Sequence, residues 1–89
     1  MELVVKTSPK FKRKFKKIAK KDPKLAKKID KRLSQLINNP GNPLLKVHKL
    51  DGHKESTWSF SVSYIIRVIF IFGDKELLIM DIGNHDDVY

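Results

Sequence analysis

The fold of this chain is decided by Trp58-Ser59-Phe60-Ser61-Val62-Ser63 and, shortly after it, Arg67-Val68-Ile69-Phe70-Ile71-Phe72. In the first segment apolar and serine side chains alternate, which predicts a half-buried antiparallel strand. The second is apolar without alternation, as expected of a central strand covered on both faces. A turn at Gly73-Asp74 precedes a further apolar strand predicted over residues 76–82. The second half of the chain therefore predicts an antiparallel sheet.

Upstream of these strands the apolar period becomes helical. Ser8-Pro9 supplies an N-cap and a proline at the first helical position. Asp22-Pro23 repeats the signal, and Asn38-Asn39-Pro40-Gly41 ends the second helix. The stripe of the first helix consists of Phe11, Phe15, Ile18 and Ala19. We expect the two helices to form a hairpin.

Two shorter strands are predicted over residues 2–6 and 45–50. The element order is then strand, two helices and four strands, which indicates one α+β domain over residues 1–89. We expect an N-terminal strand and a two-helix hairpin packed on a mainly antiparallel, twisted sheet of four to five strands.

Charge is distributed very unevenly along the chain. The net charge is +9, yet residues 1–33 hold 14 basic and 3 acidic side chains while the remainder is slightly acidic. Such a basic region indicates a surface for phosphates or for an acidic partner, or a helix face that is simply solvated. Charge alone favours neither reading.

Several classes of protein are not expected from the composition. The chain has no Cys, which removes disulfides and thiolate metal sites. No early apolar segment predicts a secretory signal, and no apolar run approaches the roughly 20 residues of a membrane span. A cytoplasmic protein without membrane attachment is expected.

The most specific motif is Ile82-Gly83-Asn84-His85-Asp86-Asp87-Val88-Tyr89. With the basic hairpin, the Leu50-Asp51-Gly52 turn and the Arg67-Val68-Ile69-Phe70 strand, it resembles the RelE/ParE superfamily of bacterial type II toxin–antitoxin toxins. The resemblance covers essentially the whole chain. It is closest to the RelE-like mRNA interferases of the YafQ and YoeB type.

This resemblance implies an endoribonuclease that enters the ribosomal A site, cuts translated mRNA and inhibits translation. It also implies a cognate antitoxin, with a free toxin that is monomeric and a silenced one in a hetero-oligomer. Cleavage without a metal uses the neighbouring 2′-hydroxyl as nucleophile, with a base, an acid and cations that stabilise the transition state. No cofactor and no metal site are expected.

The resemblance assigns catalytic positions to His85, Arg67, His48 and Tyr89. The two imidazoles would transfer protons, and Arg67 would clamp the scissile phosphate through its forked donors. Tyr89 would contact or stack on the base. Asp86 would support His85 by orienting its ring.

Each of these residues also has a structural interpretation. His85 could cap a strand-end turn, His48 could be an ordinary surface histidine, and Tyr89 could anchor the chain end on the helices. Arg67 could form an ion pair with Asp81 or Asp74. The aromatic residues of the predicted strands that start at Trp58 and at Arg67 are interpreted as core rather than as a stacking platform.

The chain departs from the YafQ-type pattern at two positions. Where that pattern has a further histidine, the nearest equivalent in this chain is Val62. Where it has an aspartate in the following turn, this chain has Tyr64-Ile65-Ile66. Two members of the acid–base set are therefore missing from this sequence.

Contacts to RNA or the ribosome are expected from the basic side chains, because phosphate contacts give affinity without sequence choice. The same surface could bind an acidic antitoxin segment that folds on binding. The candidate residues are Lys10, Lys12, Arg13, Lys14, Lys16, Lys17, Lys20, Lys46, Lys49 and Lys54.

Two other functions compete with the nuclease. A ParE-like toxin would share the fold and inhibit DNA gyrase by protein contact, without RNA cleavage. A non-catalytic nucleic-acid-binding module would need only the basic helices. The presence of His48, His85 and Arg67 together favours the nuclease.

Overall fold

The computed structural model describes residues 4–50 and 57–84. Its strands and helices follow the predicted order. They are β1 (Val4–Thr7), α1 (Pro9–Lys21), α2 (Pro23–Asn38), the 3₁₀ segment η1 (Pro43–Leu45), β2 (His48–Lys49), β3 (Thr57–Ser61), β4 (Ile66–Phe72) and β5 (Glu76–Asn84).

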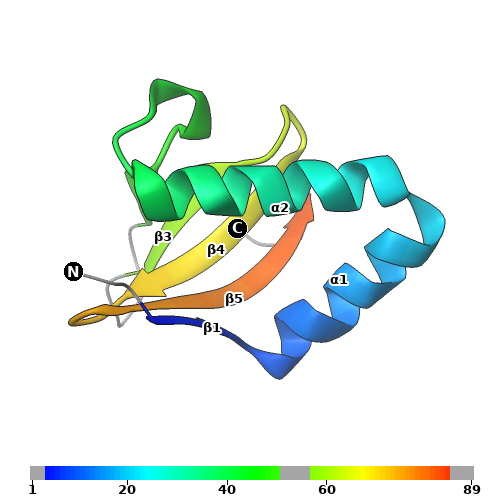
Figure 1. Cartoon of the computed structure of the whole chain (residues 1–89), viewed down its shortest axis with the longest axis horizontal. Helices are drawn as coiled ribbons and strands as arrows, with labels where there is room; N and C mark the ends of the chain where they lie inside the picture. Colours follow the sequence, from blue (N-terminus) through cyan, green and yellow to red (C-terminus); the bar gives the residue numbers. More distant parts are fainter. Residues whose placement is uncertain (1–3, 51–56, 85–89) are drawn as a thin grey trace.

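The five strands form one sheet in the order β1-β5-β4-β3-β2, so β4 is central as predicted. Only the β1–β5 pair is parallel, and the other three pairs are antiparallel. Helix α2 lies across one face of the sheet, while α1 runs beside β5 (Figure 1). The predicted α+β class and mainly antiparallel sheet are confirmed.

The helix boundaries follow from the caps identified in the sequence. The Ser8 hydroxyl accepts the N–H of Phe11 at 3.0 Å, and the Asp22 carboxylate accepts the N–H of Leu25 at 3.1 Å. Each cap satisfies an N–H group that the first turn leaves without a helical partner. Neither helix of the described chain is long and apolar enough to cross a membrane.

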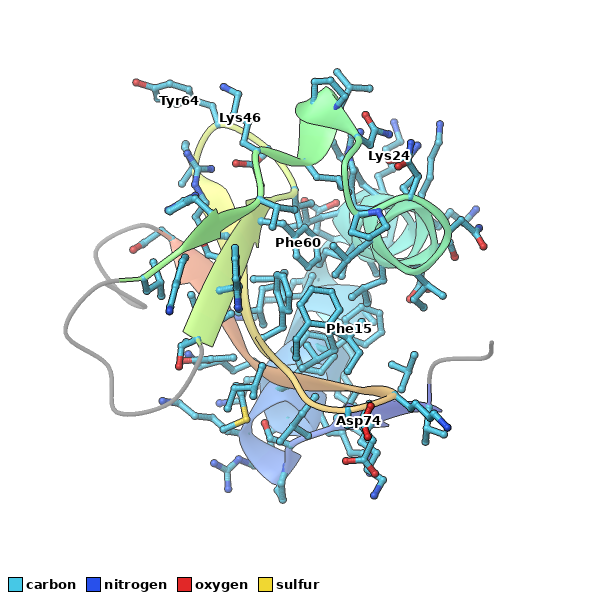
Figure 2. The ribbon with its side chains drawn as sticks, turned by 90° about the vertical axis from the view of Figure 1, so that its left-hand side faces the viewer. Phe15, Lys24, Lys46, Phe60, Tyr64 and Asp74 are labelled. Carbon is cyan, nitrogen blue, oxygen red and sulfur yellow. The ribbon has the colours of Figure 1, made fainter. Side chains whose placement is uncertain are left out.

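The core lies between the helices and the sheet. Phe60 and Phe70 are fully buried with ring centroids 5.8 Å apart, and α2 contributes the fully buried Ile29 and Leu36. Figure 2 shows Phe15 and Phe60 in this interior. The interpretation of Phe60 and Phe70 as core rather than as a base-stacking surface is therefore confirmed.

The strand predicted over residues 45–50 is wrong over most of its length. Residues 43–45 form η1, Leu45 is fully buried, and Lys46 has a φ of 49° in the left-handed region. Only His48 and Lys49 pair with β3. Pro43 starts the 3₁₀ turn because its fixed φ suits the first position of a helix. This turn keeps the residues before His48 out of the sheet.

The predicted half-burial of β3 is also wrong. Ser59 is fully buried and Ser61 nearly so, whereas Trp58 is only partly buried. On the face that carries the two serines, the ring of His48 from β2 lies against Ser59, with Nε2 at 3.3 Å from its hydroxyl. Alternation in sequence predicted the strand correctly but not the covering of its second face.

Candidate active site

The register of the sheet brings His48 and Arg67 to one face. His48 pairs with Ser59, and Arg67 pairs with Ser61 two residues further along the same strand. Side chains two residues apart on a strand share a face, and cross-strand partners do so as well. With strands about 4.8 Å apart and a rise of about 3.3 Å per residue, the two Cα atoms lie on the order of 12 Å apart.

Arg67 is half-buried at the start of the central strand β4. Its Nη1 donates to the carbonyl of Ser63 at 2.5 Å and approaches that of Ile66 at 3.4 Å. The ion pairs of the described residues involve Lys6, Lys10 and Lys14 but not Arg67. The ion pair considered between Arg67 and Asp81 or Asp74 is therefore absent. The N–H groups on Nε and Nη2 have no partner among the described residues either.

His48 is exposed, and its ring lies over the start of β3. Nδ1 is 3.1 Å from the carbonyl oxygen of Lys46, and the Ser59 hydroxyl is 3.3 Å from Nε2 and 3.5 Å from Nδ1. If Nδ1 carries the proton it donates to Lys46, and Nε2 is then an acceptor toward Ser59. The backbone carbonyl thus favours the tautomer in which Nε2 can accept a proton.

Four predicted site residues fall outside the described residues. They are His85, Asp86, Tyr89 and Lys54. Strand β5 ends at Asn84, which pairs with Ile66 beside Arg67. The structure thus brings the residue before His85 to the same end of the sheet as Arg67.

Val62 belongs to the core. Its side chain is 1% exposed and packs in the main hydrophobic cluster, and its N–H donates to the carbonyl of Ile66. The turn that follows exposes Tyr64 and Ile65. An apolar residue at position 62 is what the packing requires, since burying an imidazole there would need a hydrogen-bond partner.

The predicted RNA contacts on α1 divide into two groups. Lys10 and Lys14 form ion pairs with Asp81 of β5 at 3.2 and 2.7 Å. The other predicted cations of this helix make no ion pair within the described chain, and all of them are exposed. They are Lys12, Arg13, Lys16, Lys17 and Lys20. Lys46 and Lys49 are exposed near His48, at the edge of the sheet formed by β2.

Asp81 is held in its charged form. Burial alone would raise the pKa of its carboxyl group, but hydrogen bonds from Lys14, from the backbone N–H of Ile82 and from Lys10 lower the pKa below its ordinary 3.8. Asp81 therefore serves to join α1 to β5, and two lysines of the basic surface are partly neutralised by it.

The sequence did not indicate that Lys28 and Arg32 meet the predicted site residues Lys46 and Arg67 in one cavity. A cavity of about 210 Å³ lies between α2, η1 and the β3–β4 turn, and its lining includes Lys28, Arg32, Lys46 and Arg67. Among the described residues that line it there is no carboxylate. Lys28 and Arg32 are four residues apart, a spacing that places them on one helix face, but their convergence on a turn of the sheet is tertiary information.

A larger groove of about 330 Å³ lies between the two helices and the end of β5. Ile18, Leu25 and Ile82 contribute apolar surface to it, with Lys17 and Lys21 among its cations. The groove thus combines an apolar lining with positive charge. Within the described residues no group of three or more His, Asp or Glu side chains is placed to hold a metal ion.

Comparison with known protein families gives one match across nearly the whole chain. The family described as "ParE toxin of type II toxin-antitoxin system, parDE" matches residues 5–89. No curated protein sequence is significantly similar to the chain.

Solved structures share the fold over almost their full length. A metal-bound toxin from Helicobacter pylori is 22% identical with a TM-score of 0.84, covering 98% of this chain and 99% of the other. YafQ in the E. coli DinJ-YafQ toxin-antitoxin complex is 24% identical with a TM-score of 0.83, covering 100% and 99%. The YoeB dimer from Staphylococcus aureus is 22% identical with a TM-score of 0.81, covering 96% and 99%. Likeness at this level of identity concerns the fold.

Proposed function

The chain belongs to the ParE toxin family of type II toxin–antitoxin systems, and on this premise we propose that it is a ribosome-dependent endoribonuclease that cleaves translated mRNA. Membership of the RelE/ParE superfamily, expected from the sequence motifs, is confirmed by the family match over residues 5–89. The reaction itself is the proposal.

One observation supports the nuclease most strongly. Arg67 is half-buried on the same sheet face as His48, and no carboxylate of the described residues neutralises it. A guanidinium whose Nη1 is held by two backbone carbonyls, with its other N–H groups unpaired among the described residues, suits a phosphate that gains charge in the transition state.

The proposed reaction needs no group beyond the side chains and the RNA. A base removes the proton of the 2′-hydroxyl, whose oxygen attacks the adjacent phosphorus. The bond to the 5′-oxygen breaks, and an acid protonates that oxygen, leaving a 2′,3′-cyclic phosphate and a free 5′-hydroxyl. We assign the two proton transfers to His48 and His85, the phosphate to Arg67, and base contact to Tyr89, with Asp86 supporting His85.

A cognate antitoxin is the second part of the proposal. The structure of YafQ with DinJ is a toxin–antitoxin complex, and the groove between the helices and β5 offers apolar side chains within a rim of lysines. A segment with apolar and acidic side chains would complement both properties. We propose a cytoplasmic toxin that is monomeric when free and forms a hetero-oligomer with its antitoxin.

The test is to map mRNA 5′ ends in a cell-free translation reaction given the purified protein. The same reaction is run with His48→Gln, with His85→Ala and without ribosomes. Discrete cuts in translated codons that disappear in all three controls are expected. Intact mRNA with undisturbed translation would overturn the proposal.

Gyrase inhibition is the second candidate, because the matching family is described as the ParE toxin of parDE. It requires protein contact and none of the proposed catalytic side chains. A supercoiling assay with purified gyrase distinguishes it: inhibition by wild type and by Arg67→Gln alike, with intact mRNA, would replace the nuclease with this activity.

A further inference from the structure

The cationic cavity beside Arg67 has the composition of an anion site. Four of its lining side chains are basic, namely Lys28, Arg32, Lys46 and Arg67, and none of the described lining residues is acidic. Its volume of about 210 Å³ lies below the roughly 300 Å³ at which pockets for whole small molecules begin. A phosphate group with part of its sugar fits such a space, whereas the attached base would remain outside.

The arrangement of these cations is fixed by local structure. Arg32 donates to the side chain of Gln35 at 3.1 Å, which restrains its guanidinium on α2. Lys46 follows η1 with a φ of 49°, a left-handed conformation that is unfavourable for a residue with a Cβ. Such conformations persist where surrounding structure imposes them, and they gather at functional sites.

Tyr64 stands at the rim of the same cavity. Its side chain is 89% exposed at the tip of the β3–β4 turn, so it contributes almost nothing to the core. Figure 2 shows Tyr64 and Lys46 together at one end of the molecule. An exposed aromatic ring beside a group of cations is the combination that binds single-stranded nucleic acid, through base stacking and phosphate contact.

The turn that carries Tyr64 is held by the catalytic candidate itself. Ser63 accepts the N–H of Ile66 through its hydroxyl at 3.1 Å, and its carbonyl accepts Nη1 of Arg67 at 2.5 Å. Arg67 therefore holds the turn and is also one of the residues that line the cavity. The stacking residue and the phosphate clamp are linked through a single residue, Ser63.

We propose that this cavity binds a backbone phosphate of single-stranded RNA while Tyr64 stacks on the neighbouring base. The proposal rests on the proposed function, because it places a nucleotide next to the one that is cut. It adds Lys28, Arg32 and Tyr64 to the residues that hold the substrate. The site positions RNA and performs no chemistry of its own.

The test measures RNA binding without ribosomes and without cleavage. Fluorescence anisotropy of a labelled 2′-O-methyl oligonucleotide, which cannot be cut, is compared among wild type, Tyr64→Ala and Tyr64→Phe. Loss of one stacked base is worth about 1–3 kcal/mol, so Tyr64→Ala is expected to weaken binding by roughly 5- to 160-fold. Tyr64→Phe keeps the ring and should bind within about twofold of wild type.

A matched pair on α2 tests the phosphate contact. Lys28→Gln removes a cation that lines the cavity, whereas Lys27→Gln removes an exposed cation of the same helix that does not. Only Lys28→Gln should weaken binding and reduce its salt dependence. An oligonucleotide with abasic sugars should bind wild type and Tyr64→Ala equally, because it has no base to stack.

Three outcomes would overturn the site. The first is equal binding of RNA by wild type and Tyr64→Ala. The second is an equal effect of Lys28→Gln and Lys27→Gln. The third is that wild type binds no RNA but binds an acidic peptide that Tyr64→Ala does not bind. The last would make this surface a protein-docking site. The binding assay needs neither ribosomes nor cleavage, so it can be interpreted even where no mRNA is cut in translation reactions. A loss of RNA binding in this assay likewise does not decide whether the protein cuts mRNA on the ribosome.

Discussion

Lys14 and Asp81 join α1 to β5 through a contact of 2.7 Å between Nζ and Oδ1. The same ammonium group donates to the carbonyl of Ile82 at 3.1 Å, and Lys10 adds a second ion pair at 3.2 Å. The Asp81 side chain is only 13% exposed. Since β1 pairs with β5 only as far as Ile79, this contact attaches the helix to the part of β5 that β1 leaves uncovered.

Asp81→Asn is therefore expected to lower the free energy of unfolding at pH 7 by about 1–2 kcal/mol. Hydrogen bonds to charged groups contribute about 1.5–3 kcal/mol, and the value is smaller here because the lysine side chains are exposed. The measurement is urea denaturation followed by circular dichroism. Asp74→Asn, in the exposed β4–β5 turn, is the control and should change stability very little. Equal effects of the two substitutions would show that the contact does not stabilise the fold.

The same pair predicts a dependence on pH. The folded pKa of Asp81 lies below its ordinary 3.8, so the carboxylate stabilises the native state above that value and loses this contribution as pH falls through the folded pKa. The stability difference between wild type and Asp81→Asn should thus be full at neutral pH and shrink in acid below 3.8. A difference that is constant from pH 7 to pH 2 would contradict the assigned cause.

His48→Gln is expected to reduce the rate of mRNA cleavage by roughly 10²-fold or more, because one positioned proton transfer contributes about that factor. The glutamine keeps polarity and approximate size but cannot transfer the proton. Quantified 5′ ends from translation reactions provide the measurement, and an unchanged urea midpoint shows that the exposed position tolerates the change. Wild-type cleavage by His48→Gln would identify His48 as an ordinary surface residue.

Arg67→Lys tests the forked geometry separately from the charge. Lysine retains a cation but cannot donate to the Ser63 carbonyl and to a phosphate with a rigid planar group. A loss of about 10²-fold in cleavage is expected, the effect of removing one preorganised donor. Single-turnover rates with saturating ribosomes are the appropriate readout. Cleavage at the wild-type rate would mean that charge alone suffices.

Much of the fold could be predicted because its signals are local. Ser8-Pro9 and Asp22-Pro23 begin the two helices where the sequence indicated, since both caps act within one turn. The uninterrupted apolar run from Arg67 predicted the central strand for a similar reason. The segment before His48 was mistaken for a strand because Leu45 and Val47 fit a period of two, whereas tertiary packing of Leu45 and the left-handed Lys46 decided its form.

The site was less predictable because it is assembled from distant segments. Sequence indicated His48 and Arg67, and the sheet register places them on one face. In the sequence nothing distinguishes Lys28 and Arg32 from solvated cations of a basic helix, because only the folded chain brings them to the cavity beside the β3–β4 turn. The alternative considered for Arg67, an ion pair with Asp81 or Asp74, is absent from the described residues, and α1 rather than β4 supplies the partners of Asp81.

Val62→His is expected to destabilise the protein without restoring a missing catalytic residue. Val62 is 1% exposed in the core, so the larger polar ring would be overpacked and lack a hydrogen-bond partner. A loss of about 2–4 kcal/mol in the free energy of unfolding follows from these two effects. Urea denaturation and cleavage are measured on the same preparation. Increased cleavage at unchanged stability would show that position 62 faces the substrate.

Lys10 and Lys16 provide a final comparison, since both are lysines of α1 but only Lys10 is ion-paired with Asp81. If the exposed cations of α1 contact ribosomal RNA, Lys16→Gln should reduce the slope of log affinity against log salt by roughly 0.7–0.9, the value for one phosphate contact. Lys10→Gln should reduce it less, because Asp81 already offsets part of that charge. Sedimentation with ribosomes at several KCl concentrations measures both slopes. Equal reductions would show that the ion pair with Asp81 opens when α1 meets RNA, and no reduction for either would place the ribosome contact on another surface.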